Sequence, residues 1–333
     1  MNGVFVIAEV GQAHDGSLGI LHSYIDAVSE TGANAIKFQT HIAEAESSSF
    51  EPFRVNFSYE DKTRYDYWKR MSFTLAQWRE IKQHCEKVGL EFISSPFSIM
   101  AVEMLEQIGV KKYKIGSGEV SNRLMLETIC KTDKDIILSS GISSYQELDQ
   151  AVSLVKTYGN KLTILQCTTK YPTLPSDIGL NVLAELGSRY DVDVGLSDHS
   201  GTIFPSLAAV SLNSKMIEAH IVFDKRIFGP DSSSSLNIDE FKYLVRGVRD
   251  ISTMLSSPID KVDLSEKGEL KRIFEKSLAV RSNLHKGHIL TVGDLETKKP
   301  AGHGISASEF GKVVGKPLKK DLKKWDFLTE ADV

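Results

Sequence analysis

Short apolar runs alternate with amphipathic stretches eight times within residues 1–257. The runs are continuously apolar, which is typical of parallel strands buried on both faces. They fall at 4–8, 35–38, 92–95, 112–115, 136–139, 162–166, 192–196 and 216–217. Helical periodicity follows at 18–31, 75–88, 101–108, 124–130, 145–158, 180–190, 203–213 and 239–254. Eight such units predict an α/β fold, a (β/α)8 TIM barrel, with a doubly wound open sheet as the lesser alternative.

Three segments depart from this alternation. A polar and aromatic insertion at 42–71 is too long for a plain connection, so we expect it to be functional or partly mobile. Residues 258–274 are charged and are expected to be a linker. Residues 275–333 carry short apolar runs broken by glycine, which indicates a small second domain. Its lysine-rich stretch 312–324 is either a solvated face or part of an anion site.

Composition excludes several classes of protein. The chain has 333 residues, a net charge of -4 and 25% charged residues, which gives no reason to expect nucleic acid as a partner. No apolar run reaches the length of a membrane span, and the N-terminus enters a strand without a basic leader. Cys85, Cys130 and Cys167 are far apart and odd in number. We therefore expect reduced thiols, a cytoplasmic location and no membrane association.

Polar side chains gather where the expected strands end. In a parallel barrel these ends meet on one face, where active sites are built, whereas a purely structural barrel needs no such convergence. The polar residues at these ends are Glu9, Gln12, Lys37, Gln39, Ser94, Ser95, Lys114, Ser117, Gly118, Glu119, Ser139, Ser140, Gly141, Gln166, Thr168, Thr169, Tyr171, Ser197, Asp198, His199, Glu218 and His220.

Two histidines follow two consecutive strands. Residues 192–196 lead to His199, and residues 216–217 lead to His220. Neutral imidazoles at adjacent strand ends could bind one divalent cation, so these residues are the predicted metal ligands. The alternative is two unrelated histidines, one hydrogen-bonded and one solvated.

Two lysines near strand ends suit a phosphorylated ligand. Lys37 and Lys114 supply charge, while the Gly-Ser-Gly and Ser-Ser-Gly turns at 116–118 and 139–141 supply hydroxyl and backbone donors. A lysine here could instead be a Schiff-base nucleophile, although a metal pair argues against it. Glu9 could be a general base or a capped carboxylate at a turn.

A set of motifs in fixed order resembles the sialic acid synthase family, which includes N-acetylneuraminate, pseudaminate and legionaminate synthases. The motifs cover residues 7–16 (IAEVGQAHDG), 36–40 (IKFQT), 94–97 (SSPF), 113–119 (YKIGSGE), 137–141 (ILSSG), 166–172 (QCTTKYP), 195–199 (GLSDH) and 218–220 (EAH). Residues 298–305 and 314–318 resemble the antifreeze-like (SAF) domain of that family. The resemblance covers essentially the whole chain.

The resemblance implies that phosphoenolpyruvate condenses with the open-chain aldehyde of an N-acylated amino sugar. C3 of the enol attacks the aldehyde, water adds at C2, and phosphate leaves. His199 and His220 would hold Mn2+ or Mg2+, which polarises the aldehyde. Glu9 would act as acid or base, with Glu218 as a further catalytic residue. Phosphoenolpyruvate would be bound by Lys37, Lys114, Ser117, Gly118, Ser139 and Ser197, and the sugar by Gln39, Thr169, Tyr171, Asp231 and Lys299.

The resemblance also implies a homodimer in which the second domain of one chain caps the barrel of the other. Three positions depart from the neuraminate-type pattern: Thr169 and Ala13 stand where asparagine is usual, and Lys299 stands where arginine is usual. Lysine lacks the planar guanidinium fork of arginine, so the resemblance predicts the reaction more firmly than the identity of the sugar. Alternatives are a synthase for a different or phosphorylated sugar, and a non-catalytic carbohydrate-binding protein.

Overall fold

Eight parallel strands close into a barrel in the computed structural model, which describes residues 3–55, 57–262 and 267–333. The strands are β1 (Phe5–Glu9), β2 (Ala35–Thr40), β3 (Glu91–Pro96), β4 (Lys112–Ile115), β5 (Asp135–Ser139), β6 (Leu162–Cys167), β7 (Asp193–Asp198) and β8 (Met216–Val222). Each pairs with the next, and β1 also pairs with β8, placing Glu9 opposite His220. Closure confirms the (β/α)8 barrel and excludes the open sheet.

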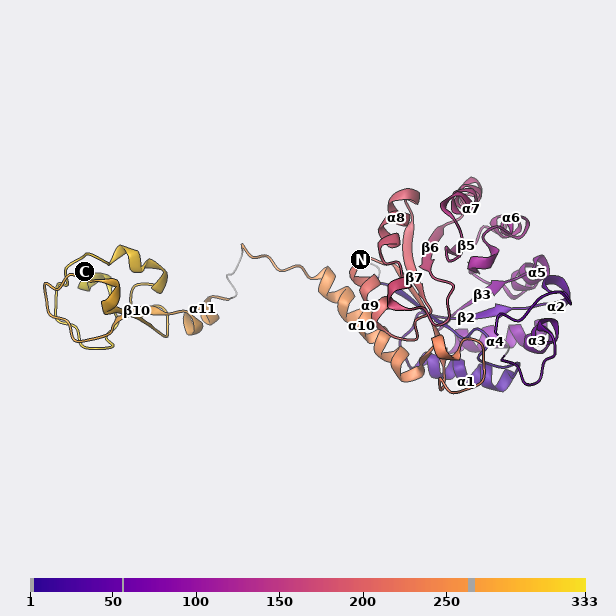
Figure 1. Ribbon diagram of the computed structural model, residues 1–333, viewed down its shortest axis with the longest axis horizontal. Helices are drawn as coiled ribbons and strands as arrows, with labels where there is room; N and C mark the ends of the chain where they lie inside the picture. Colours follow the sequence, from indigo (N-terminus) through magenta and orange to yellow (C-terminus); the bar gives the residue numbers. More distant parts are fainter. Residues whose placement is uncertain (1–2, 56, 263–266) are drawn as a thin grey trace. The chain divides into compact units, whose positions relative to one another are not determined.

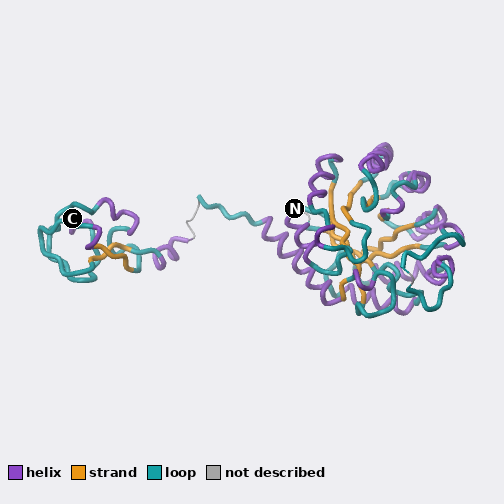
Figure 2. Tube along the Cα trace, viewed as in Figure 1, coloured by secondary structure: helices purple, strands orange, loops and turns teal. Residues whose placement is uncertain are grey.

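Helices form a ring outside the strands, as Figures 1 and 2 show. They are α1 (Leu18–Ser29), α4 (Leu75–Lys87), α5 (Ile99–Ile108), α6 (Arg123–Cys130), α7 (Tyr145–Tyr158), α8 (Asn181–Tyr190), α9 (Phe204–Ser211) and α10 (Ile238–Ser256). Apolar side chains of strands and helices pack between the two layers as the main core. Within the described residues, no helix has the length and apolar character needed to cross a membrane.

Local sequence explains where several helices begin and end. Thr74, Ser144 and Asn237 form capping boxes with the residue three positions later, so orphan N–H groups at the starts of α4, α7 and α10 are satisfied. Gly109 and Gly159 end α5 and α7 in the left-handed conformation that glycine adopts without steric cost.

The interior of the barrel changes from apolar to polar along each strand. One layer consists of Ile7, Ala35, Ile93, Ile137, Leu165 and Met216. Side chains two residues apart on a strand point to the same side. The next inward positions are therefore Glu9, Lys37, Ser95, Ser139, Cys167 and Glu218, and all of them line a cavity. The apolar layer thus forms the floor on which a polar site is built.

The insertion after β2 is folded rather than extended. It contains α2 (Ala43–Glu46) and α3 (Arg64–Met71) and its own small apolar cluster. The cluster comprises Ala43, Tyr67, Trp68 and Met71, with Phe53, Phe57 and Tyr65 packed against it. Arg70 fastens the insertion through ion pairs to Asp61 (2.7 Å) and to Asp15 (2.6 Å), in the loop after β1.

The chain divides into two compact units, residues 1–257 and 258–333. The second unit contains α11 (Gly268–Phe274) and an antiparallel pair, β10 (Ser277–Val280) with β11 (Leu295–Lys298). Helix α11 lies in the stretch 258–274 that is expected from the sequence to be a linker. The charged composition of this stretch does not indicate a helix. The core of this unit is Leu278, Val280, Leu284, Leu290, Ile305, Val313, Leu318, Leu322 and Leu328. The lysines at 312, 319, 320, 323 and 324 are exposed around it.

Candidate active site

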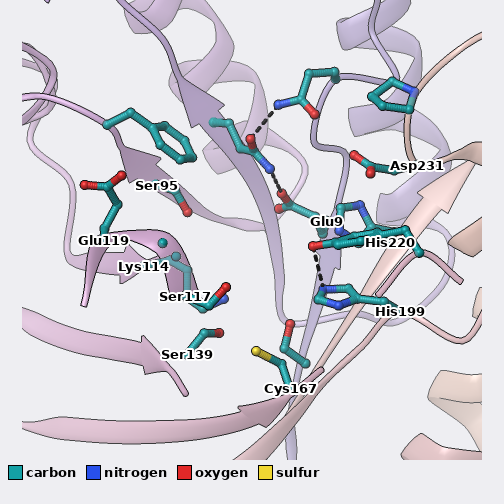
Figure 3. A pocket seen from close by; sticks show the side chains of 18 of the residues that line it. Glu9, Ser95, Lys114, Ser117, Glu119, Ser139, Cys167, His199, His220 and Asp231 are labelled. Atoms are coloured by element: carbon teal, nitrogen blue, oxygen red, sulfur yellow. Dashed lines mark hydrogen bonds between the residues drawn. The ribbon is translucent and has the colours of Figure 1, made fainter. Parts of the chain in front are cut away.

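A cavity of about 390 Å3 lies where the strands end (Figure 3). It brings together most of the residues predicted from the sequence: Glu9, Lys37, Gln39, Lys114, Ser117, Gly118, Ser139, Tyr171, Ser197, His199, Glu218, His220 and Asp231. Thr169 is not among the lining residues, but its hydroxyl lies 3.1 Å from that of Ser117. Lys299 belongs to the second unit, where its ammonium lies 4.9 Å from the centre of the Phe274 ring.

Two lysines and two carboxylates form a charge cluster at the base of the cavity. Lys37 Nζ lies 2.7 Å from Glu9 Oε2 and 3.8 Å from Glu218 Oε2. Lys114 Nζ donates to Glu218 Oε1 at 2.7 Å, and the Ser197 hydroxyl donates to the same oxygen at 2.9 Å. All five side chains are buried, so their charges interact with little screening.

The charges of this cluster shift the pKa values of Glu218 and Lys37. Burial by itself would raise the pKa of Glu218, but Lys114 and Lys37 lower it below its usual value. Burial would lower the pKa of Lys37, yet the charges of Glu218 and Glu9 raise it. The two positive and two negative charges cancel. An anionic ligand would therefore enter a site whose own charge is balanced.

The two histidines predicted as metal ligands lie side by side. Their ring centroids are 5.3 Å apart. Nδ1 of His199 lies 2.9 Å from the carbonyl oxygen of Thr168, which assigns the ring proton to Nδ1 and leaves the lone pair on Nε2, 3.5 Å from the Tyr171 hydroxyl. Burial, followed by the field of His220, lowers the pKa of His199 to about 3, so the imidazole is neutral at pH 7. His220 lies within β8, because that strand is longer than its apolar run indicates.

This donor set fits a divalent cation bound by two neutral imidazoles. A carbonyl acceptor behind one ring nitrogen is the usual support of a metal-ligating histidine. Across residues 3–55, 57–262 and 267–333, no group of three or more His, Cys, Asp or Glu side chains is arranged to hold a metal. Substrate and water would therefore have to supply the remaining ligands.

Hydroxyl groups line the side of the cavity next to β4 and β5. Ser117 belongs to a short turn after β4, and Ser139 ends β5 with its buried hydroxyl lacking a hydrogen-bond partner. Gly141 allows the close approach of the two loops. A Cβ there would lie 2.5 Å from Thr169 Oγ1 and 2.8 Å from Cys167 Sγ. The arrangement offers donors to an oxyanion ligand.

The insertion supplies a second wall that sequence reasoning missed. Arg54 pairs with Asp231 at 2.8 Å, and its guanidinium lies 4.0 Å from the ring centre of Tyr171. Tyr171 in turn stacks on His199 with ring centroids 4.4 Å apart. Arg54 thus joins the insertion to the histidine pair.

Further lining residues come from the same insertion. Arg64 lies 4.1 Å above the Trp68 ring and 3.4 Å from a carboxylate oxygen of Glu51. Glu46 also lines the cavity. Only the unusual length and the polar, aromatic composition of the insertion signal a function, since the helical period of α3 does not show which side chains reach the cavity.

Matches to known proteins cover nearly the whole chain. Residues 24–260 match the model of the NeuB family, and residues 275–333 match that of the SAF domain. The chain is 33% identical to the N,N'-diacetyllegionaminic acid synthase of Campylobacter jejuni, covering 99% of this chain and 100% of that one. It is 32% identical to the human N-acetylneuraminate-9-phosphate synthase, covering 98% and 91%. The crystal structure of an N-acetylneuraminic acid synthetase from Leptospira borgpetersenii superposes with a TM-score of 0.72 and 31% identity, over 81% of this chain and 91% of that one.

Proposed function

Because this chain belongs to the NeuB family, we propose that it condenses phosphoenolpyruvate with the aldehyde of an N-acylated amino sugar. Membership confirms the resemblance noted in the sequence and makes the chain an enzyme of the nonulosonic acid synthase class. The donor, the acceptor sugar, the metal and the residue roles are the content of the proposal. The observation that carries it is the convergence of Lys37, Lys114 and the histidine pair in one cavity.

The base of the cavity suits phosphoenolpyruvate. Lys37 and Lys114 provide two ammonium groups, and Ser117, Ser139 and Ser197 provide hydroxyl donors. The unpartnered Ser139 hydroxyl is a donor that a phosphate oxygen would satisfy. Because Glu9 and Glu218 already neutralise the lysines, a bound trianion needs additional positive charge.

A divalent cation on His199 and His220, Mn2+ or Mg2+, would supply that charge and polarise the sugar aldehyde. The neutral state of His199 is the one that binds a metal. The acceptor that holds the His199 proton on Nδ1 is the backbone carbonyl of Thr168, so a side-chain substitution at residue 168 would not remove it.

In the proposed reaction, C3 of the enol forms a bond to the aldehyde carbon, and the aldehyde oxygen takes up a proton to become a hydroxyl. Water adds to C2 and loses one proton, which leaves a hydroxyl on C2. When the bond between C2 and the bridging oxygen breaks, this hydroxyl loses its proton to become the keto oxygen, and inorganic phosphate leaves with the electron pair of the broken bond and takes up that proton. The lysines and serines hold the phosphate while its charge changes. Glu9, held by Lys37 and Gln39, is placed to exchange protons with the reacting groups.

The second wall of the cavity, formed by the insertion, favours an unphosphorylated sugar. Among the described lining residues, both arginines are paired with carboxylates, Arg54 with Asp231 and Arg64 with Glu51. A sugar phosphate would have to displace one of these carboxylates. N-acetylmannosamine and N-acylated 2,4-diamino-dideoxy hexoses have no such cost, so they are the proposed acceptors.

The proposal is tested with purified protein, phosphoenolpyruvate and Mn2+ against a panel of aldoses. The panel contains N-acetylmannosamine, its 6-phosphate and N-acylated 2,4-diamino-dideoxy hexoses. Phosphate release should require a sugar, and the unphosphorylated sugars should give the higher kcat/KM. If none of these sugars supported phosphate release, the proposed acceptor class would be wrong.

A further inference from the structure

Five buried or half-buried side chains form one hydrogen-bonded chain across the barrel mouth. Gln39 Nε2 donates to Glu9 Oε1 at 2.8 Å, the bond that reaches Glu9 in Figure 3. Gln12 Nε2 donates to Gln39 Oε1 at 2.5 Å and lies 3.1 Å from His41 Nε2. His41 Nδ1 lies 2.6 Å from Glu46 Oε1. The chain therefore runs from the base of the cavity to the first helix of the insertion.

The carboxylate at the Glu9 end determines the direction of every bond. Glu9, ion-paired with Lys37, can only accept, so Gln39 must present its amide N–H to it. The carbonyl of Gln39 then faces Gln12, which must donate in turn. His41 Nε2 lies 3.1 Å from the same Gln12 nitrogen and 3.3 Å from Gln39 Oε1, so a neutral ring protonated at Nδ1 accepts from Gln12, whereas a ring protonated at Nε2 would donate to Gln39.

The carboxylate at the other end demands the same arrangement. A neutral His41 that accepts at Nε2 carries its proton on Nδ1, where it donates to Glu46. The backbone N–H of Ile42 donates to the other oxygen of Glu46 at 3.3 Å and holds that carboxylate in place. Both ends thus select one pattern of donors.

The imidazole itself is rigidly held. His41 lies between the rings of Trp68 and Phe97, with centroid distances of 3.8 Å and 4.5 Å and interplanar angles of 18° and 15°. It is buried and does not line the cavity. Its position behind the substrate site indicates that it acts through other residues.

We propose that His41 and Glu46 are positioning residues that fix the amide of Gln39 so that it donates to Glu9. The inference rests on the proposed function, because Glu9 is the group assigned there to proton exchange and Gln39 is the residue that holds it. The orientation leaves the second N–H of Gln39 for the sugar. If the His41 proton moved to Nε2, that nitrogen would face the N–H of Gln12 as a second donor and could donate only to Gln39 Oε1, 3.3 Å away, so the bond from Gln12 to His41 would be lost.

Two substitutions of His41 separate positioning from packing. In His41→Gln the amide oxygen occupies the place of Nε2 and can still accept from Gln12, whereas in His41→Asn the polar atoms occupy the place of Nδ1. Both remove the stacked ring. We expect His41→Gln to keep kcat within about threefold and His41→Asn to lower it about tenfold or more, with KM for phosphoenolpyruvate little changed. Equal losses in both variants would mean that His41 only packs.

A double-mutant cycle tests the route through Gln12. Gln12→Met breaks the chain, so His41→Asn should lower kcat no further in that background. An undiminished effect of His41→Asn in the Gln12→Met protein would overturn the relay. Thermal unfolding of each variant serves as the control for loss of folded protein.

The tautomer of His41 can be read without substrate, so this test is independent of the proposed reaction. In protein labelled with 15N at histidine, the His41 signals are assigned by their absence from His41→Gln. We expect the Nδ1–H tautomer, shifting toward Nε2–H in Glu46→Gln. An Nε2–H tautomer or a doubly protonated ring in the unsubstituted protein would refute the arrangement. Failure of turnover with an Nδ1–H ring would count against the proposed function alone.

Discussion

At the scale of single residues, the site uses paired charges rather than isolated ones. Each lysine at the base of the cavity has a carboxylate within 2.7 Å. Such buried groups are costly unless paired, and the carboxylates also raise the pKa of Lys37. The ammonium groups can bind a phosphate electrostatically but are poor nucleophiles. The histidine pair is the opposite case, since burial lowers the pKa of His199 and its neutral ring has a lone pair to offer a cation.

The first prediction concerns the metal. A chelator should abolish turnover, and Mn2+ should restore it. His220→Ala should lose one of the two protein ligands, so metal affinity measured by calorimetry should fall by more than the about 10–100-fold typical of outer-shell changes. His84→Ala, which removes a half-buried histidine that lies outside the cavity and contacts His22 and Asp26 of α1, is the matched control. Full activity of His220→Ala in chelated buffer would exclude this role.

The second prediction is that neither Lys37 nor Lys114 forms a Schiff base. Both ammonium groups are ion-paired, and the carboxylates raise the pKa of Lys37 against the effect of burial. Borohydride treatment in the presence of substrate should leave the protein mass unchanged. A stable adduct on either lysine, located by peptide mass spectrometry, would point to an aldolase instead.

At the scale of elements, the barrel follows from the sequence and the insertion does not. Continuous apolar runs identify the strands, and period-two alternation places Glu9, Lys37 and Glu218 inward. Arg54 and Glu46 could not be predicted in the same way. They reach the cavity through a fold held by an aromatic cluster and ion pairs between distant residues, which no local pattern records.

The third prediction concerns the fastening of the insertion. Arg70→Met should loosen residues 57–71 by about 1–3 kcal/mol, because the hydrogen-bonded ion pairs with Asp61 and Asp15 are lost. Hydrogen exchange of this segment measures the effect. Arg189→Met is the control. It removes an exposed ion pair with Asp149 between α8 and α7 and should leave hydrogen exchange in residues 57–71 unchanged.

The same contact gives a pH dependence. The hydrogen bond from Arg70 holds the pKa of Asp61 below its ordinary value. This stabilisation is present above the unfolded pKa of about 4 and is lost as the pH falls through the lower folded value. Exchange in residues 57–71 should therefore accelerate below about pH 4, and Arg70→Met should remove most of that pH dependence. If Arg70→Met showed the same pH dependence of exchange as the unsubstituted protein, Asp61 would not be the titrating group.

At the scale of the whole molecule, the second unit has its own core but only a small one. We propose a homodimer in which this unit of one chain caps the barrel of the other and so excludes water. Lys299 would then contribute to the sugar site of the partner chain. The argument rests on the small size of the unit and on the family to which the chain belongs.

The fourth prediction is complementation between two defective chains. His199→Ala impairs the barrel, and Lys299→Glu places a repelling carboxylate in the cap. Each homodimer should be poorly active. With exchanged caps, a mixed dimer unites one intact barrel with one intact cap, so activity should return after subunit exchange. No gain on mixing would show that each cap serves its own barrel.

In the proposed reaction, one cavity joins phosphoenolpyruvate to an amino sugar with cleavage of the bond between C2 and the bridging oxygen. Phosphoenolpyruvate labelled with 18O at the bridging position tests it directly. We predict one nine-carbon or larger keto acid per phosphate released, with the label in the phosphate. Label retained in the organic product, or phosphate released at the same rate without sugar, would contradict this proposal.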